Sequence, residues 1–206
     1  MLRVCMMNTL LHVGCGNARI QHTTAGFNDG TWRELRVDIN PAVKPDVLGS
    51  MLDMSSVADA SVNAVYSSHS IEHLYPHEVP QALAEFLRVL KHDGFAVFTC
   101  PDLQSICQLV AEDKLLEPAY EVPAGKITPL DMLYGFRRDL ALGNVWMAHH
   151  SGFTRSSLTA ILKENGFGSV LVMARNFAPH YDLWAIAGKS ARDDADMLEL
   201  MSKHFP

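Results

Sequence analysis

The chain has 206 residues, of which 48% are hydrophobic and 19% charged, so it is long enough to bury the core of one domain and has no signature of disorder. Its formal net charge is −6 and it has no run of basic residues, which argues against a nucleic-acid surface and against an anionic membrane. Four scattered cysteines, without metal-like spacing, lead us to expect buried free thiols in a reducing cytoplasm: Cys5, Cys15, Cys100 and Cys107.

Strand patterns recur along the chain with helical patterns between them. The predicted strands are short and rich in β-branched and aromatic residues, and they cover 10–13, 34–38, 46–48, 62–67, 95–99, 169–174 and 183–188. Between the fourth and fifth strands, apolar residues at helical spacing predict a helix that begins near Val79 and ends with Gly94 in a left-handed cap. A second helix is expected from Thr154, as N-cap, to Gly166. This alternation predicts an α/β fold with a doubly wound, Rossmann-like, mostly parallel seven-stranded sheet.

Two stretches depart from a simple strand–helix repeat. The segment 17–32 contains Gly26 and Gly30 and is too short for a full helix. The segment 101–153 is long, and its first part, 103–115, has a helical pattern. Because ligands of open α/β sheets bind beyond the strand carboxyl ends, we expect 101–153 to be a substrate-side insertion or lid within a single domain that spans 1–206. The charged tail from Ser190 predicts a surface helix.

A glycine-rich turn is the first motif that carries chemistry. Val13-Gly14-Cys15-Gly16 follows the first predicted strand, and Asp38 ends the second. Doubly wound folds hold a nucleoside in this way, with the turn near the charged part of the ligand and the acid on the ribose hydroxyls. The structural alternatives are a tight turn at the glycines and an Asx turn from Asp38 to Pro41.

Further motifs follow in the same order as in a known family. They are Leu52-Asp53-Met54, then Ser68-His69-Ser70-Ile71-Glu72-His73-Leu74, then Arg88-Val89-Leu90-Lys91-His92-Asp93-Gly94-Phe95. Together with the glycine turn and Asp38, they resemble the class I S-adenosylmethionine (SAM)-dependent methyltransferases, in particular small bacterial members of the methyltransferase-11 kind. The similarity covers about residues 9–102, and the segments 153–167 and 183–187 are similar to the family's final helix and strand.

The resemblance implies a SAM site that begins at the glycine turn. Gly14 and Gly16 would lie under the methionine part of the cofactor. Asp38 would accept the ribose hydroxyls, and Ile39 would lie against the adenine ring. At the position two residues before Gly14, where the family usually has an acid, this chain has His12. A neutral histidine offers no charge attraction, so either the cofactor binds more weakly or another acid compensates.

The resemblance also implies roles for the later motifs. Asp53 would meet the adenine amino group with Met54 alongside, although a solvated loop carboxylate is the alternative for Asp53. Ser68 and His69 would lie near the transferable methyl group. An oxygen acceptor needs a base, for which His73 and His69 are the candidates.

The pattern His69-Ser70-Ile71-Glu72-His73 has a rival interpretation. It is a His-x-x-Glu-His pattern, which some zinc peptidases place on a helix, and a third ligand could come from His149 or His150. Pro76 follows too soon for a sustained helix, so we assign no metal site here. His149 and His150 are otherwise either general bases or polar loop residues. Further candidates for pocket walls, with surface or packing roles as the alternative, are Tyr75, His77, Tyr134 and Arg137.

The sequence thus predicts a cytoplasmic enzyme that transfers a methyl group from SAM to an acceptor, most simply a small molecule. No nucleic acid or membrane partner is expected, and the sequence gives no indication of the oligomeric state. Two other classes stay open, namely a catalytically inactive SAM-binding regulatory protein and a zinc-dependent hydrolase. A nicotinamide dehydrogenase fits poorly, because Arg19 replaces the third glycine of Gly-x-Gly-x-x-Gly.

Overall fold

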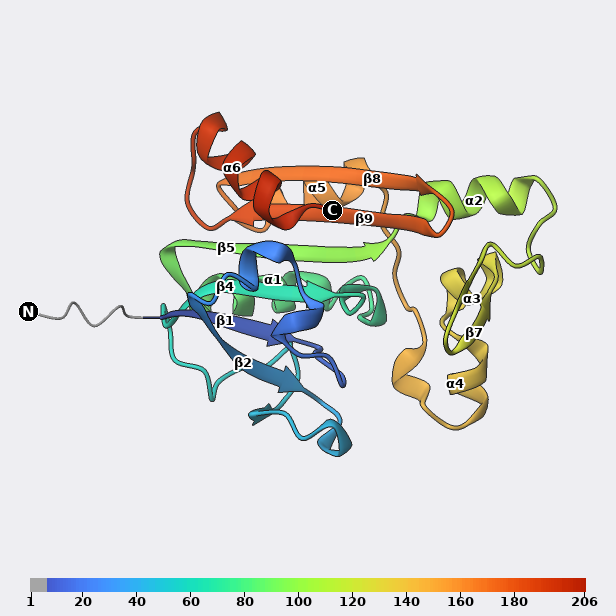
Figure 1. Cartoon of the computed structure of the whole chain (residues 1–206), viewed down its shortest axis with the longest axis horizontal. Helices are drawn as coiled ribbons and strands as arrows, with labels where there is room; N and C mark the ends of the chain where they lie inside the picture. The colour runs from blue at the N-terminus through green and yellow to red at the C-terminus, as the bar shows by residue number, and fades with distance from the viewer. Residues whose placement is uncertain (1–6) are drawn as a thin grey trace, which may run out of the picture.

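The computed structural model describes residues 7–206, which form a seven-stranded sheet with helices on both faces (Figure 1). In spatial order the strands are β3 (Val47–Leu48), β2 (Trp32–Asp38), β1 (Asn8–Val13), β4 (Val62–Ser68), β5 (Leu90–Pro101), β9 (His180–Gly188) and β8 (Ser169–Phe177). The first five are parallel, and β9 runs antiparallel to β5 and β8. The predicted fold class, a mostly parallel seven-stranded doubly wound sheet, is confirmed.

Helices α1 (Val79–Val89) and α5 (Arg155–Glu164) cover one face of the sheet. The apolar stripe of α1 is wholly buried there, with Leu83 and Phe86 at 0% exposure. Burial of each such side chain stabilises the fold by about 1.5–3 kcal/mol. Thr154 caps α5 as predicted, because its side chain accepts a hydrogen bond from the Ser157 amide.

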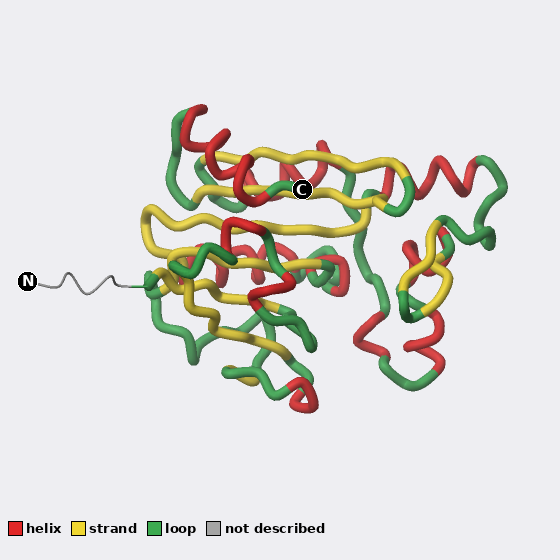
Figure 2. The backbone as a smooth tube through the Cα atoms, in the orientation of Figure 1, coloured by secondary structure: helices red, strands yellow, loops and turns green. Residues whose placement is uncertain are grey.

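The opposite face is covered by much less helix. Two short 3-10 helices, η1 (Ile20–His22) and η2 (Ala25–Phe27), occupy the segment in which no full helix was expected (Figure 2). Helix α6 (Asp194–His204) packs beside them, and its Met197 and His204 are buried. The C-terminal helix therefore completes the core of this face and is more than a surface helix.

The helices are short throughout residues 7–206. The longest, α1 and α6, have 11 residues each, and no helix combines the length and apolar character needed to cross a bilayer. The expectation that Gly94 caps α1 is wrong, since α1 ends at Val89 and Gly94 lies within β5. A Cβ at Gly94 would lie 3.0 Å from the Asn63 carbonyl oxygen, so this glycine allows β4 and β5 to approach closely.

Residues 102–153, called here the β5–α5 segment, project beyond the carboxyl ends of the parallel strands (Figure 1). Its elements are α2 (Leu103–Ala111), the hairpin β6 (Tyr120–Val122) and β7 (Gly125–Ile127), α3 (Pro129–Tyr134), α4 (Arg137–Ala141) and η5 (Val145–Met147). The two ends of the segment are joined by a hydrogen bond of 2.9 Å from the Leu103 amide to the Phe153 carbonyl. Helix α2 ends at Ala111, four residues before the predicted end, because Asp113 takes a positive φ.

The cysteines within residues 7–206 are all free thiols. Cys15 and Cys100 are buried as expected. The expectation is wrong for Cys107, which lies on α2 and is exposed, whereas Ser105 and Ile106 of the same helix are buried. Cys5 lies outside the described residues.

Candidate functional site

The glycine turn begins where β1 ends. Gly14 and Gly16 have φ angles of 66° and 50°, which glycine adopts without steric cost. A Cβ at Gly14 would lie 2.3 Å from Ser70 Oγ, so the turn packs tightly against the loop after β4. A Cβ at Gly16 would meet nothing within 4 Å. The turn is therefore closed on its Ser70 side and open at Gly16.

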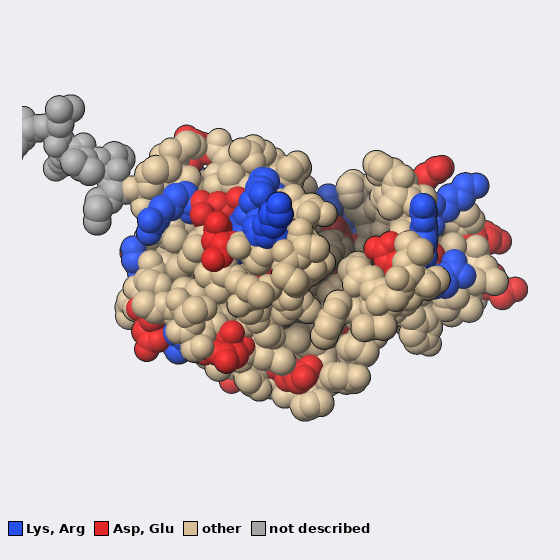
Figure 3. Space-filling view, turned by 90° about the horizontal axis from the view of Figure 1, so that it is seen from below, with Lys and Arg blue, Asp and Glu red and all other residues tan. Residues whose placement is uncertain are grey.

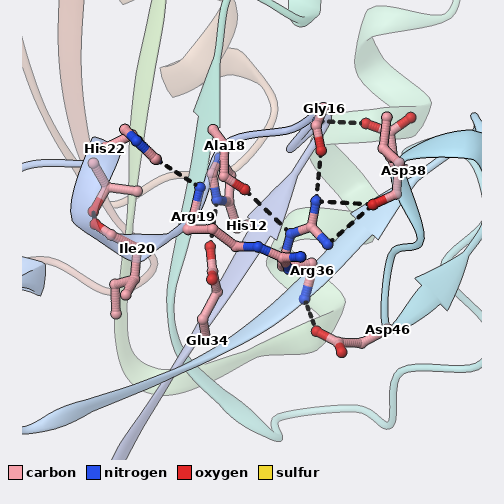
Figure 4. Close-up of polar contacts among 12 residues, drawn as sticks. His12, Gly16, Ala18, Arg19, Ile20, His22, Glu34, Arg36, Asp38 and Asp46 are labelled. Carbon is pink, nitrogen blue, oxygen red and sulfur yellow. Dashed lines mark hydrogen bonds and ion pairs between the residues drawn. The ribbon is translucent and has the colours of Figure 1, made fainter.

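The structure brings Asp38 to this turn. Its Oδ2 accepts a hydrogen bond of 2.7 Å from the Gly16 amide, and its Oδ1 accepts one of 2.8 Å from the Asn40 amide. Asp38 is at the carboxyl end of β2 and 9% exposed. The two predicted parts of the site, distant in sequence, are thus joined by a direct contact (Figure 4).

Arg36, which the sequence analysis did not single out, binds the backbone of the glycine turn. Its buried guanidinium donates to the carbonyl oxygens of Gly16 at 2.5 Å and Ala18 at 3.2 Å (Figure 4). It also donates to the Lys44 carbonyl oxygen at 2.9 Å. It therefore ties the glycine turn to the loop after η3 (Pro41–Val43). The signal in the sequence was a charged residue at an inward-facing position of a strand, since buried charges are rare unless they have partners.

His12 is paired with an acid from the neighbouring strand. Its Nδ1 lies 2.7 Å from Glu34 Oε1, and the histidine is 3% exposed. Burial lowers the pKa of His12, although the Glu34 carboxylate opposes this shift. A neutral His12 therefore donates its Nδ1–H to Glu34. A carboxylate thus stands next to the position where the family usually has its acid.

The residues expected around an adenine differ in exposure. Ile39 is 44% exposed next to Asp38. Asp53 is exposed, and its Oδ1 accepts a hydrogen bond of 3.0 Å from the Ser55 amide. Met54 is only 1% exposed, so its side chain belongs to the core. Its amide donates to Glu85 Oε2 at 2.7 Å and its carbonyl accepts from Arg88 at 2.8 Å.

Strand β4 ends at Ser68, whose Oγ lies 2.7 Å from Thr99 Oγ1 of β5. His69 follows with a φ of 47°, which turns the chain sharply out of the sheet. Its amide still bonds the Thr99 carbonyl at 2.9 Å, and its side chain is about half exposed. The next element, η4 (Ile71–His73), is a single 3-10 turn. The helix that a peptidase-type His-x-x-Glu-His site needs does not form.

A cavity of about 300 Å³ lies between this edge of the sheet and the β5–α5 segment. The surface is visibly hollowed between these two parts of the molecule (Figure 3). Its walls come from the sheet edge, η4 and the β5–α5 segment: His69, Glu72, His73, Pro101, Tyr120, Ile127, Asp131, Met132, Phe136, Met147, His149, Pro179, Tyr181 and Asp182. The wall contains both catalytic candidates, whereas Gly14, Gly16 and Asp38 lie on the adjoining strand ends.

Glu72 is the most buried acid of this wall, at 1% exposure. His69 Nδ1 lies 3.4 Å from its Oε1. Burial works to raise the pKa of the Glu72 carboxyl, but His69 and His73 hold it below its ordinary value. Burial works to lower the pKa of His69, but Glu72 raises it above its ordinary value. Glu72 therefore stays ionised in the wall.

His73 and His149 meet from opposite sides of the cavity wall. Their ring centroids are 4.9 Å apart. His73 Nδ1 is 3.0 Å from the Ala148 carbonyl, and His149 Nδ1 is 2.9 Å from the Met132 carbonyl. Each Nδ1–H donates to a carbonyl, which leaves Nε2 of each ring with its lone pair.

The other candidates lie outside the cavity wall. His150 is exposed and stacks on Tyr75, with centroids 4.2 Å apart, and His77 also stacks on Tyr75. Tyr134 is 62% exposed. Arg137 pairs with Asp131 at 2.7 Å and so supports the wall from behind.

A family model described as a methyltransferase domain matches residues 11–98, which run from β1 into β5. No curated protein sequence matches this chain. The β5–α5 segment lies entirely outside the matched residues. The match therefore covers the sheet edge that holds Gly14, Gly16, Asp38 and Ser68, but not the other half of the cavity.

Solved structures share the fold at low sequence identity. A SAM-dependent methyltransferase from Archaeoglobus fulgidus is 17% identical, with a TM-score of 0.59 over 89% of this chain and 86% of that chain. One from Methanosarcina mazei is 16% identical, with a TM-score of 0.57 over 91% and 94%. The 1,6-didemethyltoxoflavin-N1-methyltransferase of Burkholderia thailandensis, solved with 1,6-didemethyltoxoflavin and S-adenosylhomocysteine bound, is 16% identical, with a TM-score of 0.54 over 89% and 72%.

Proposed function

We infer that this chain, a class I SAM-dependent methyltransferase, transfers the methyl group of SAM to a small molecule held between the sheet and the β5–α5 segment. The observation that carries the acceptor site is the cavity of about 300 Å³ at the carboxyl edge of the strands. Cavities of this size are typical for small ligands, and this edge is where open α/β sheets bind them. The β5–α5 segment then acts as the lid of the site.

The glycine turn and Asp38 fit the nucleoside and methionine parts of SAM. Space is open at Gly16, so a ligand can approach the backbone there. The Asp38 carboxylate receives one amide bond on each oxygen, and each oxygen can accept a further bond from a ribose hydroxyl. Gly14 and Gly16 would lie under the methionine part, with Ile39 against the adenine ring.

The remaining cofactor contacts follow the same edge of the sheet. Asp53 would accept from the adenine amino group, and the buried Met54 would lie alongside, beneath the surface. Ser68 would lie near the methyl group. The His12–Glu34 pair carries one negative charge when His12 is neutral, as a single acid would. We assign this pair the place of the missing acid near the methionine ammonium.

Bound SAM supplies a methyl group that its sulfonium already activates. What the chain adds is alignment of the acceptor and exclusion of water. The stacked rings of Tyr120 and Tyr181, 6.4 Å apart, and the side chain of Phe136 give the cavity apolar, flat walls. Such walls suit a flat, partly apolar acceptor.

An oxygen acceptor also needs a group that removes its proton, and the candidates are His73 and His69. His73 has its Nδ1–H bonded to the Ala148 carbonyl, which leaves Nε2 free to accept a proton. Glu72 raises the pKa of His69, so His69 releases a proton less readily. The geometry therefore favours His73 as the candidate base.

The test is methyl transfer from radiolabelled SAM to a panel of small hydroxylated and amino-substituted aromatic compounds. We expect label in a small-molecule product, with the rate lowered at least about tenfold by His73→Ala. His77→Ala, in an exposed side chain outside the cavity, serves as the control and should keep the wild-type rate. Unchanged turnover by His73→Ala would refute its role. Cofactor binding without transfer to any compound would favour the regulatory alternative.

A further inference from the structure

We propose that Glu72, His73 and His149 bind a divalent transition-metal ion in the wall of the acceptor cavity. One side-chain ligand atom from each of the three residues lies within 4.8 Å of the others. All three residues line the cavity. Two imidazole nitrogens and a carboxylate oxygen are a common ligand set for such ions, which leaves further coordination positions open.

The Glu72 carboxylate supplies the first independent reason to expect a cation. The residue is 1% exposed, and neither of its oxygens has a hydrogen-bond partner among residues 7–206. The contact of 3.4 Å with His69 Nδ1 lacks hydrogen-bond geometry. His69 offers Glu72 only a long ion-pair contact, and a buried, ionised carboxylate that accepts no hydrogen bond is costly. A cation at this point would satisfy it.

The two imidazole rings are oriented as metal ligands usually are. Each ring donates its Nδ1–H to a backbone carbonyl, His73 to Ala148 and His149 to Met132. Such a bond fixes the tautomer and leaves Nε2 with a lone pair, which is the arrangement around most metal-bound histidines. Potential ligand atoms of the three residues thus lie close together, and among residues 7–206 neither Glu72 oxygen accepts a hydrogen bond.

The backbone around the three ligands is preorganised. The Glu72 carbonyl accepts hydrogen bonds from the amides of His150 at 2.9 Å and Ser151 at 3.1 Å. These bonds hold the end of the β5–α5 segment against η4. The ion would therefore join two parts of the wall that are already fixed to each other, and little reorganisation is needed to bind it.

The ligand set narrows the identity of the ion. Mg²⁺ and Ca²⁺ prefer oxygen ligands, whereas imidazole suits Zn²⁺, Co²⁺ and Fe²⁺. Because all three residues line the cavity, an acceptor with an oxygen or nitrogen donor atom could complete the coordination. This last step rests on the proposed function, whereas the metal site itself does not. A bound ion occupies Nε2 of His73, so His73 would act as the base only in the metal-free protein, and the ion would itself lower the pKa of a coordinated acceptor hydroxyl.

This site differs from the zinc-peptidase pattern that the sequence suggests. In that pattern His69 and His73 would share one face of a helix, but His69 lies before the 3-10 turn and has a positive φ. In the site proposed here Glu72 takes the place of His69 as a ligand. The third ligand is His149, one of the two histidines that the pattern allowed, 76 residues along the chain from His73. The metal would therefore belong to the acceptor cavity and not to a hydrolytic site.

The test is metal titration of the full-length protein after treatment with a chelator. We expect one Zn²⁺ per chain by calorimetry, and one Co²⁺ with visible absorption bands that report nitrogen ligation. His149→Ala and Glu72→Gln should each weaken the affinity at least about tenfold. The matched control is His150→Ala, since His150 is adjacent in sequence but stacks on Tyr75 outside the cavity.

Binding of S-adenosylhomocysteine is measured on the same samples and shows whether each variant is folded. Absence of Zn²⁺ and Co²⁺ binding by the wild-type protein would overturn the proposal. Equal loss of metal affinity in His150→Ala and His149→Ala would also overturn it. If the metal-free protein binds S-adenosylhomocysteine, a failure of the metal site leaves the methyltransferase assignment intact. If Glu72→Gln does not fold, the metal site is tested by the metal affinity of His149→Ala and by the Co²⁺ spectrum of the wild type.

Discussion

At the scale of single residues, the glycine turn depends on a left-handed backbone, which glycine adopts more readily than other residues. Gly16 and Gly30 both have positive φ angles, and an added Cβ would meet nothing within 4 Å at either position. They differ in location, since Gly16 lies at the carboxyl edge of the sheet beside Asp38 and Gly30 precedes the amino end of β2. Comparing substitutions at Gly16 and Gly30 therefore distinguishes the effect of backbone strain, expected at both positions, from the effect of ligand contact, expected only at Gly16.

We predict that Gly16→Ala and Gly30→Ala each lower the free energy of unfolding by about 1–2 kcal/mol, which is the cost of a left-handed backbone for a residue with a Cβ. Only Gly16→Ala should also weaken binding of S-adenosylhomocysteine, because its methyl group would occupy the open side of the turn. Urea denaturation and calorimetry measure the two effects. Equal cofactor affinity in both variants would argue against a ligand at Gly16.

Single residues also show where sequence reasoning stops. The contact between Gly16 and Asp38 was predictable, because strand order places both at one edge of a parallel sheet. The role of Arg36 was not, because its partners are backbone carbonyls whose positions depend on the folded loops. The burial of Met54 was missed for a similar reason, since a residue in a loop gives no periodic pattern.

At the scale of elements, α6 is anchored by a buried histidine. His204 Nδ1 lies 2.6 Å from Thr24 Oγ1, and its ring centroid lies 4.3 Å from that of Phe27. Burial lowers the pKa of His204 to about 4, with a further contribution from Lys203 and a small opposing one from Asp29. The helix is therefore attached to η2 through a histidine that has to stay neutral.

This anchor predicts how stability depends on pH. The unfolded chain binds the proton near pH 6.5 and the folded chain only near pH 4, so unfolding takes up a proton between these values. Stability should therefore fall by up to about 3 kcal/mol as the pH drops from about 6.5 to about 4. His204→Phe should flatten this dependence in urea denaturation. Part of the slope should persist, because the pKa of His12 is also lowered. An identical slope in the variant would contradict the assignment.

The elements of the sheet were easier to predict than those outside it. Enrichment in apolar, β-branched and aromatic residues locates β1, β4 and the second half of β5, because these strands are buried on both faces. The β5–α5 segment gave no readable pattern beyond its first helix, since its short elements pack on one another through Asp131, Arg137 and Thr128. Such polar contacts carry no periodic signal.

At the scale of the whole molecule, the cavity exists only if the β5–α5 segment keeps its shape. Gly135, with a φ of 97°, lies at the contact between α3 and η5, and an added Cβ would lie 1.9 Å from the Met147 carbonyl oxygen. Gly143, with a φ of 90°, lies in the same segment, but its Cβ would meet nothing within 4 Å. A substitution would therefore strain the backbone at both glycines, but only at Gly135 would the added Cβ clash with a neighbouring atom.

We predict that Gly135→Ala opens the segment to limited proteolysis within residues 102–153 and lowers methyl transfer, whereas Gly143→Ala changes both much less. Both variants should still bind S-adenosylhomocysteine, because the cofactor residues lie on the strand ends. Cleavage sites found by mass spectrometry report the opening. Equal cleavage of the two variants would show that the Gly135 contact does not hold the segment in place.

At this scale the molecule combines a sheet edge, which we propose binds SAM, with the β5–α5 segment that walls the cavity on the other side. The family match ends at residue 98, before this segment begins. The sequence therefore identifies the cofactor better than the acceptor. His149 illustrates why the acceptor site is harder to predict. Its place next to Glu72 and His73 depends on the path of the whole β5–α5 segment.

The central claim is that the edge formed by the glycine turn and Asp38 binds SAM. Calorimetry with S-adenosylhomocysteine tests it most directly, on the wild type and on Asp38→Asn, which keeps the side-chain shape and removes its charge. We predict one bound molecule per wild-type chain and an affinity lowered at least about tenfold in Asp38→Asn, since hydrogen bonds to a charged group contribute about 1.5–3 kcal/mol. No binding by the wild type, or equal affinity in the variant, would contradict the assignment.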